Sequence, residues 1–285
     1  MVGSVSTPDL VATCWTSAGN VGPLDPSEAS PIPVLERVRA VGATGWMGMG
    51  LVYDDLLVVR DTIGFAELRH HAHAAGLKHL EVELATGWWR TDDQSWRGKW
   101  NLLLEAATEL DAAFVKIGTE FGEPVSDLTM FVEPLRHLAD EAAAAGTRVA
   151  LEPLPFGLIA SMPQGAELMR AVDHPAAGLL VDYWHVFRAG TSLAELADCL
   201  DPSIVFGIEL CDARVEVVGT LFEDTRDRRT LVGQGDQDVT GFIRTIRDIG
   251  YTGPWGVEIL SSEHRQRPLW DALRAAYSTA LQAFD

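Results

Sequence analysis

The chain has 285 residues, and 41 aspartate and glutamate residues against 22 lysine and arginine residues give it a formal net charge of −19. So large an acidic excess repels a phosphate backbone, and we therefore expect no nucleic-acid partner. Because 47% of the residues are hydrophobic, a chain of this length can bury a large core.

The N-terminal segment and the cysteines indicate the cellular compartment. MVGSVSTPDL carries no basic residue and no long apolar run, so we expect no signal peptide. No stretch approaches the roughly 20 apolar residues that cross a bilayer, so we expect no membrane association. Three cysteines, Cys14, Cys199 and Cys211, fit no metal-binding spacing and indicate reduced thiols in a cytoplasmic protein.

Strand-like and helix-like segments alternate along the chain. Amphipathic stretches such as 65–76 and 131–146 end in glycine, which is a signal for the C-terminus of a helix. Eight βα units predict a single (β/α)8 TIM barrel over residues 1–285. Eight apolar segments predict the strands: 10–15, 45–51, 77–84, 112–118, 148–153, 177–183, 204–210 and 255–260.

The longest irregular stretches, 16–30, 85–95 and 212–237, all follow predicted strands. In a barrel such loops lie over the catalytic face. The alternative is a doubly wound open sheet, but no glycine-rich phosphate loop follows the first strand, which weakens that interpretation.

Four acidic residues end successive apolar segments in the second half of the chain, and a carboxylate there is costly unless it is paired or bound to a cation. Strand alternation places small or apolar inward residues before each one. An all-oxygen ligand set favours Mn or Mg over Zn. The alternative is a structural salt bridge with arginine or lysine, most of all for the third residue. The proposed metal ligands are Glu152, Asp182, Glu209 and Glu258.

Two further residues near these strand ends are candidates for catalysis. Lys116 lies in FVKIG and needs an anionic partner. It can polarise a substrate oxygen or carry a proton, or it can form a structural pair with Glu81 or Glu83. Glu83 is nearer its strand end and is the better candidate for substrate contact. His185 can orient a substrate hydroxyl or support the metal, or it can cap or pack beneath the loop.

The predicted loops supply the remaining candidates. Arg229, in RRTLVGQGDQDVTGF, is placed to bind an anionic or hydroxylated end of a substrate. Trp88 and Trp89 follow the third strand and are expected to stack on a sugar-like ring. Asp238 or Thr240 is expected to cap a late helix, which is a structural role.

The residues together resemble the xylose isomerase-like TIM-barrel superfamily of sugar isomerases and epimerases, the sugar phosphate isomerase/epimerase family. The pattern comprises Glu152 after strand five, Asp182 with His185 after strand six, an Asp on strand seven (here Asp212) and Glu258 on strand eight. The RRTLVGQGDQD stretch also matches the family's Arg and Gly-x-Gly segment. Glu209 departs from the pattern, because a histidine or an amide usually stands there. This departure implies either a changed metal preference or a Glu209 that no longer binds metal.

The resemblance implies a divalent-metal-dependent isomerase or epimerase acting on a keto sugar or related polyol through an enediolate. Glu152 and Glu258 would transfer the protons. One alternative is a lyase or dehydratase of the 3-dehydroshikimate or inosose type, and another is a non-catalytic sugar-binding barrel. The family's DNA endonuclease branch is disfavoured, because His185 is the single ligand-like histidine near the proposed site. A homo-oligomer is compatible with these observations.

Overall fold

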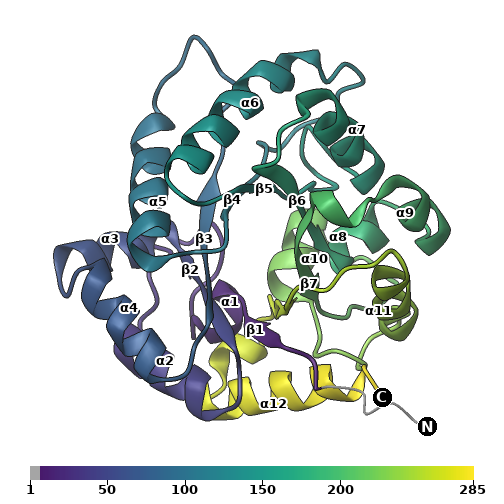
Figure 1. The fold of residues 1–285 in the computed structure, drawn as a ribbon. Helices are drawn as coiled ribbons and strands as arrows, with labels where there is room; N and C mark the ends of the chain where they lie inside the picture. The colour runs from purple at the N-terminus through teal and green to yellow at the C-terminus, as the bar shows by residue number, and fades with distance from the viewer. Residues whose placement is uncertain (1–6) are drawn as a thin grey trace, which may run out of the picture.

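The computed structural model describes residues 7–285. Residues 1–6, part of the segment predicted not to be a signal peptide, lie outside the described residues. Eight parallel strands close into a barrel in the order β1 to β8, and the helices surround it (Figure 1). The predicted (β/α)8 TIM barrel is therefore confirmed.

All eight predicted strands are present, although their ends differ from the prediction by several residues. Each strand pairs in parallel with the next, and β1 pairs with β8 to close the barrel. The first strand ends early because the next residues form a short helix. The strands are Leu10–Ala12 (β1), Gly48–Val52 (β2), His79–Ala85 (β3), Val115–Ile117 (β4), Val149–Leu151 (β5), Ala177–Asp182 (β6), Val205–Leu210 (β7) and Trp255–Val257 (β8).

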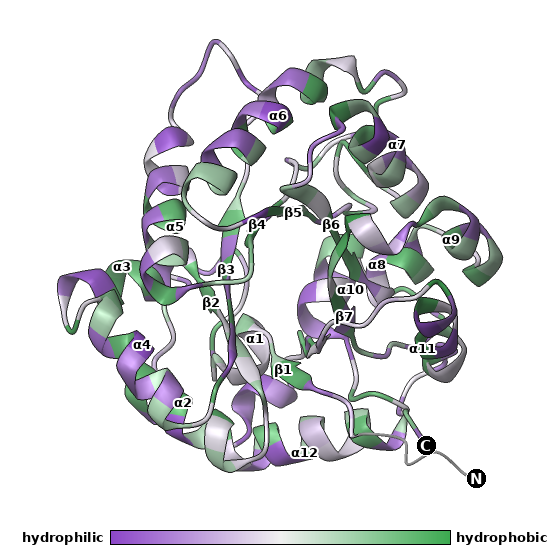
Figure 2. Cartoon of the chain, viewed as in Figure 1, coloured by the Kyte–Doolittle hydropathy of each residue, from purple (hydrophilic) through white to green (hydrophobic). Residues whose placement is uncertain are grey.

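The helices cover the outside of the barrel with mixed faces, whereas strands such as β5 and β6 are hydrophobic (Figure 2). One helix, α10, lies inside the stretch 212–237 that was predicted to be irregular. The helices are Cys14–Ser17 (α1), Val34–Ala43 (α2), Tyr53–Asp61 (α3), Phe65–Ala74 (α4), Arg97–Leu110 (α5), Thr129–Ala144 (α6), Met162–Val172 (α7), Tyr183–Arg188 (α8), Leu193–Cys199 (α9), Leu221–Asp227 (α10), Val239–Asp248 (α11) and Leu269–Gln282 (α12), with 3-10 turns at Pro202–Ile204 (η1) and His264–Gln266 (η2).

An apolar layer fills the barrel interior on the N-terminal side of the carboxylates. Phe114, Ala150, Leu180 and Phe206 form one buried cluster there. A Cβ atom at Gly207 would lie 2.6 Å from Leu180 and 2.9 Å from Phe114, so a larger residue would not fit. Because inward residues alternate along a strand, the residues two positions further on lie one layer higher, at the C-terminal end of the barrel.

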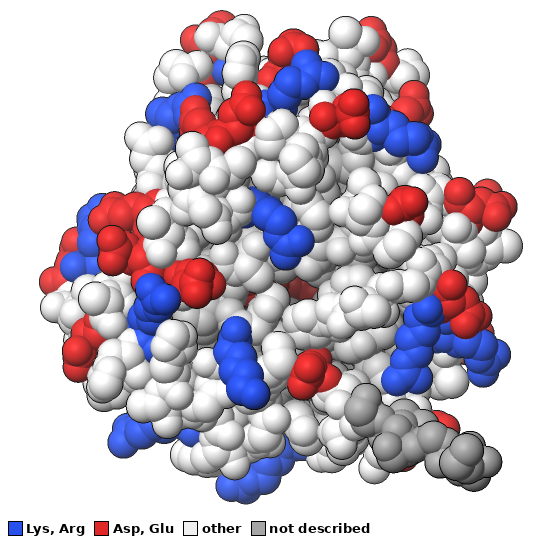
Figure 3. Space-filling view, in the orientation of Figure 1, with Lys and Arg blue, Asp and Glu red and all other residues white. Residues whose placement is uncertain are grey.

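Charged side chains of both signs are scattered over the face in Figure 3, and this face carries no continuous basic patch. Within residues 7–285, no helix has the length and hydropathy needed to cross a bilayer.

Candidate metal centre

The parallel barrel brings the four predicted ligands to one end of its interior. Asp182 is the last residue of β6 and Glu209 lies near the end of β7, while Glu152 and Glu258 directly follow β5 and β8. Their side chains are buried, with Asp182 fully enclosed. One carboxylate oxygen from each of the four lies within 4.8 Å of the others. The group has the oxygen donors and the spacing that a divalent cation requires.

The position of the Glu209 side chain depends on a glycine of the neighbouring strand. A Cβ atom at Gly256 of β8 would lie 3.1 Å from Cγ of Glu209. The missing side chain therefore gives Glu209 room to reach the centre of the barrel. Oε2 of Glu209 is buried and has no hydrogen-bond partner among residues 7–285. A buried carboxylate oxygen without a partner is costly, and a bound cation would satisfy it.

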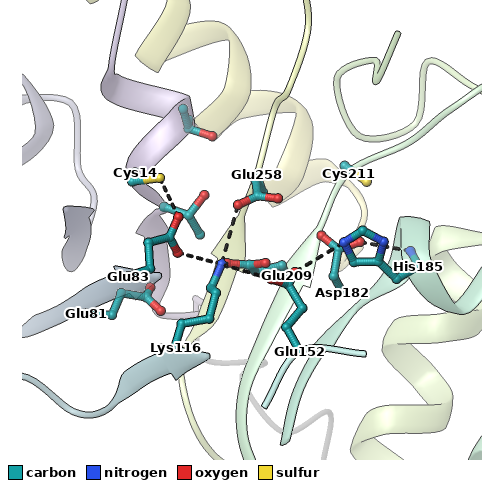
Figure 4. A network of polar contacts seen from close by, with 12 residues as sticks. Cys14, Glu81, Glu83, Lys116, Glu152, Asp182, His185, Glu209, Cys211 and Glu258 are labelled. Atoms are coloured by element: carbon teal, nitrogen blue, oxygen red, sulfur yellow. Dashed lines mark hydrogen bonds and ion pairs between the residues drawn. The ribbon is translucent and has the colours of Figure 1, made fainter. Parts of the chain in front are cut away.

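Two buried cations already contact the carboxylates. Nζ of Lys116 lies 2.7 Å from Oε1 of Glu209, and Nη1 of Arg229 lies 2.6 Å from Oδ2 of Asp182. Arg229 also lies 3.2 Å from Oε2 of Glu258. Figure 4 shows the ammonium of Lys116 between the acidic side chains. The sequence also allowed an alternative in which some of these acids pair with lysine or arginine. Such ion pairs are present in the structure.

His185 forms a second group of potential metal ligands together with Glu152 and Asp182. Asp182 caps α8 by accepting a hydrogen bond from the backbone N–H of His185 at 3.1 Å, and Nε2 of His185 lies 3.3 Å from Oε1 of Glu152. Donor atoms of Glu152, Asp182 and His185 lie within 4.8 Å of one another. The same two carboxylates can therefore bind a cation together with a ring nitrogen, a donor that suits zinc better than an all-oxygen set does.

Neighbouring charges and burial shift the pKa values of the two predicted proton-transfer residues in opposite directions. Burial alone would raise the pKa of Glu152, but the Lys116 ammonium and the hydrogen bond with His185 outweigh burial and lower this pKa to about 2. Burial raises the pKa of Glu258 to about 8, against the opposing charges of Lys116 and Arg229. Two acids with pKa values on either side of neutrality can serve as one base and one acid.

The protein cations do not balance the buried acids. Burial would lower the pKa of Lys116, but the surrounding carboxylates, led by Glu152, outweigh it and raise this pKa. Burial and then the charge of Glu258 raise the pKa of Glu209 in spite of Lys116. Closely grouped carboxylates resist full ionisation without further positive charge. The donor types, the spacing and the partnerless oxygen of Glu209 thus fit a divalent cation.

Glu83 is already engaged on both oxygens. Its Oε1 accepts from Sγ of Cys14 at 2.6 Å, and its Oε2 lies 2.7 Å from Nζ of Lys116. The structural pair considered for Lys116 is therefore present with Glu83. Glu81 lies deeper in the barrel, and burial raises its pKa to about 7 despite Lys116. Cys14 was not singled out from the sequence as a site residue, because its contact depends on the closure of the barrel.

A cavity of about 530 Å³ lies above the carboxylates. Glu83, Lys116, Glu152, His185 and Arg229 line its polar part. Its walls are mostly apolar, and three phenylalanines pack together there: the ring centroid of Phe121 lies 5.1 Å from that of Phe156 and 5.0 Å from that of Phe222. These phenylalanines are site residues that were not predicted from the sequence. Phe121 and Phe156 lie in two different loops and Phe222 lies in α10, so only the fold reveals that they meet. The wall residues include Trp15, Leu24, Phe121, Leu154, Phe156, Phe222 and Leu260.

The structure places Trp88 and Trp89 away from this cavity, so the prediction that they stack on a substrate ring is not supported. They are 1% and 6% exposed. Both rings pack on Phe131 of α6, with centroid separations of 5.7 and 5.4 Å. The indole N–H of Trp88 donates to the carbonyl of Gly118 at 2.8 Å. The two side chains fix the β3–α5 loop on the outer wall of the barrel.

Arg229 is inside the site, but it is committed to protein partners. It is 1% exposed. Beyond its pairs with the acids, its guanidinium donates to Oγ1 of Thr225 from Nε at 3.1 Å and from Nη2 at 2.9 Å. It also borders the cavity. Its predicted contact with a substrate end stays a prediction. Asp238 caps α11 through the N–H of Gly241, as expected from the sequence.

A model of the xylose isomerase-like TIM barrel family matches residues 35–279. The chain belongs to this family. The resemblance inferred from the strand-end residues is therefore confirmed.

Curated relatives of this family member match only in part. The 3-dehydroshikimate dehydratase of Pseudomonas putida is 29% identical over 171 residues, which are 60% of this chain and 26% of the relative. The inosose isomerase of Bacillus licheniformis is 26% identical over 153 residues, which are 53% of this chain and 54% of the relative. The chain thus spans between about a quarter and about a half of the length of these relatives.

Solved structures share the barrel over nearly its whole length. An IOLI protein with a binding zinc atom superposes with a TM-score of 0.83 at 19% identity, over 96% of this chain and 97% of the other. D-Psicose 3-epimerase in the presence of D-fructose gives 0.72 at 15% identity, over 96% and 98% of the two chains. At these identities the likeness shows the fold.

Proposed function

We propose that this chain is a divalent-metal-dependent isomerase or epimerase that acts on a keto sugar or related polyol. The observation that carries the proposal is the buried group of Glu152, Asp182, Glu209 and Glu258, in which one carboxylate oxygen from each lies within 4.8 Å of the others. Four oxygen donors favour Mn or Mg. When bound there, such a cation would acidify a proton next to a substrate carbonyl.

The two glutamates supply the proton transfers in this proposal. Glu152, with a pKa of about 2, is ionised at neutral pH and removes a proton from the substrate carbon. Burial raises the pKa of Glu258, and in this proposal Glu258 returns a proton to the substrate carbon. The strands β5 and β8 that precede them lie three positions apart in an eight-stranded barrel. The acids therefore approach an enediolate from different sides.

Lys116 and His185 have positioning roles in the same proposal. Their contacts with Glu152 favour its ionised form, and both side chains border the cavity, where they can orient a substrate carbonyl or hydroxyl. The apolar wall of phenylalanines can pack on the C–H face of a sugar or polyol ring. Glu83 and Arg229 also border the cavity and are polar candidates for contact with substrate hydroxyls.

A lyase or dehydratase is the second candidate, favoured by the similarity to 3-dehydroshikimate dehydratase over 60% of the chain. The first step would be the same proton removal. A β-hydroxyl would then leave with a proton from the second acid, so that one water is lost. The outcome depends on which acid faces the leaving group.

Proton exchange in deuterated water separates the two reactions. The protein is incubated with Mn²⁺ and, one at a time, with ketoses, inososes and 3-dehydroshikimate, and products are followed by NMR. Solvent deuterium at carbon without loss of water supports the isomerase or epimerase, and a dehydrated product supports the lyase. The absence of exchange and of dehydration with all these substrates would count against both.

A non-catalytic sugar-binding barrel belongs to a different functional class, and metal content distinguishes it. The proposed enzyme should retain close to one divalent cation per chain after gentle purification, or regain it on addition of Mn²⁺, as measured by elemental analysis. A chain that neither retains nor regains a cation would favour the binding protein.

A further inference from the structure

One lysine crosses the barrel interior and reaches acids on opposite sides of it. Lys116 comes from the middle of β4, and it is 2% exposed. Its Nζ atom lies 2.7 Å from Oε2 of Glu83 on β3 and 2.7 Å from Oε1 of Glu209 on β7. Figure 4 shows the ammonium at the centre of the network. A lysine in this position is a cation that the protein itself supplies to the carboxylates.

The same ammonium is close to two more of the proposed metal ligands. It lies 3.6 Å from Oε1 of Glu258 and 3.8 Å from Oε2 of Glu152. Three of the four proposed ligands are therefore within 4 Å of one lysine nitrogen. A divalent cation bound to the same oxygens would be repelled by this ammonium at short range, where little water screens the charges.

Glu83 offers the lysine a place to remain when a cation binds. It does not belong to either group of potential ligands, and its other oxygen is held by Cys14 at 2.6 Å. Glu83 is thus fixed on the side of the site near β3, away from β7 where Glu209 lies. An ammonium that leaves Glu209 can keep its contact with Glu83, so it need not become a buried charge without a partner.

We propose that Lys116 competes with the divalent cation for Glu209, and that Glu83 retains the lysine when the cation binds. Lys116 then has two effects on the site, neither of which is a direct part of the reaction. It neutralises part of the carboxylate group before the cation arrives, and it lowers the affinity for the cation. The inference rests on the metal site of the proposed function.

The first test replaces Lys116 with methionine, which has a similar length and no charge. In Lys116→Met we expect Mn²⁺ affinity to rise about tenfold or more, by analogy with the 10- to 100-fold effects of residues next to metal ligands. The melting temperature in a chelator should fall, because the acids lose their counter-charge. Lys78→Met, at an exposed position before β3, is the matched control. Calorimetric titration with Mn²⁺ and thermal denaturation in EDTA are the measurements.

The second test uses the retaining residue. Glu83→Gln should weaken Mn²⁺ binding in the wild-type background, because Lys116 would then stay with Glu209. In the Lys116→Met background, the same change should have a clearly smaller effect, because no ammonium remains to be moved. A simple loss of negative charge near the metal would lower the affinity equally in both backgrounds, so the double-mutant cycle isolates the competition.

The outcomes separate this inference from the proposed function. If the wild type binds Mn²⁺ and Lys116→Met binds it equally or more weakly, the competition is wrong and the metal site stands. Equal effects of Glu83→Gln in the two backgrounds would overturn the role of Glu83. If neither the wild type nor any variant binds a divalent cation, both the metal site and the competition are wrong.

Discussion

Glu258 is the residue on which the proposed chemistry depends most directly. Its carboxyl is buried, which raises its pKa, and it can give and take a proton, which a glutamine cannot do. We expect Glu258→Gln to lower proton exchange by about 10²- to 10⁴-fold, the usual contribution of a general acid or base. It should also weaken metal binding while the far-UV circular dichroism remains that of the wild type.

Glu263→Gln is the matched control for this prediction. Glu263 follows Glu258 closely in the sequence, but its side chain is 78% exposed. Deuterium exchange should be close to wild type in the control. Full activity in Glu258→Gln would show that the two-glutamate mechanism is wrong.

Glu209 tests the identity of the metal. We expect Glu209→His to bind metal with a preference shifted toward zinc or cobalt, because an imidazole nitrogen suits those ions. Glu209→Ala should lower Mn²⁺ affinity about tenfold or more. Calorimetric titrations of each variant with Mn²⁺ and Zn²⁺ give both quantities. Unchanged Mn²⁺ affinity in Glu209→Ala would place this side chain outside the coordination sphere, and His185 would then be the next donor to test.

At the scale of elements, a buried ion pair holds α2 and α3 to the short helix α1. Arg37 of α2 is fully buried and pairs with Asp55 of α3, and its guanidinium also donates to Oγ of Ser17 at 3.1 Å. Arg37→Leu should lower the free energy of unfolding by about 3–5 kcal/mol, because Asp55 is left as a buried charge. Urea denaturation measures this change.

The double variant Arg37→Leu/Asp55→Leu should recover part of the loss, because no unpaired charge remains. Arg39→Leu on the exposed face of the same helix is the control and should change stability by less than about 0.5 kcal/mol. An equal loss in Arg37→Leu and Arg39→Leu would show that the buried pair is not the cause.

The sequence predicted those parts of the molecule that depend on local pattern. Eight apolar segments predict eight strands, and alternation within a strand predicts that Glu152, Asp182, Glu209 and Glu258 point inward. The helix α10 was missed, although Thr220 and Glu223 form a capping box at its start. That signal was available in the sequence as Thr-x-x-Glu.

Other features depend on contacts between distant elements and could not be predicted. The pairing of Lys116 on β4 with Glu209 on β7 requires the closed barrel, because 93 residues separate the two. The loop that carries Trp88 and Trp89 folds back onto α6, where Phe131 provides a place to bury them. A sequence pattern shows that a loop is rich in aromatic residues, but not which surface it covers.

At the scale of the whole molecule, a largely buried histidine at the N-terminal end of the barrel should make the free energy of unfolding depend on pH. His79 at the start of β3 is 13% exposed in its side chain, and its ring lies 6.1 Å from that of Phe114. Burial, and then the charge of Arg148, lower the pKa of His79 from 6.5 to about 4. Between these two pH values the unfolded chain binds a proton that the folded barrel does not bind.

The contribution of His79 to stability is therefore fully present above about pH 6.5 and is lost as the pH falls toward 4, at up to about 1.4 kcal/mol per pH unit. In His79→Gln, the decrease in the free energy of unfolding between pH 7 and pH 5 should be smaller than in the wild type. Urea titrations at the two pH values test this, with His73→Gln on the exposed part of α4 as the control. An identical decrease in His79→Gln and wild type would contradict the prediction.

The buried acids at the top of the barrel have a consequence for attempts to engineer this protein. Glu83, Glu152, Asp182, Glu209 and Glu258 are all at most 6% exposed, and Lys116 and Arg229 are the buried cations that contact them. Well-packed apolar residues often stabilise a core more than buried ion pairs do. Selection for heat resistance alone should therefore enrich apolar substitutions at these positions and yield more stable barrels that lack the proposed activity. The positions where stability and activity change in opposite directions would then outline the active site without any knowledge of the substrate.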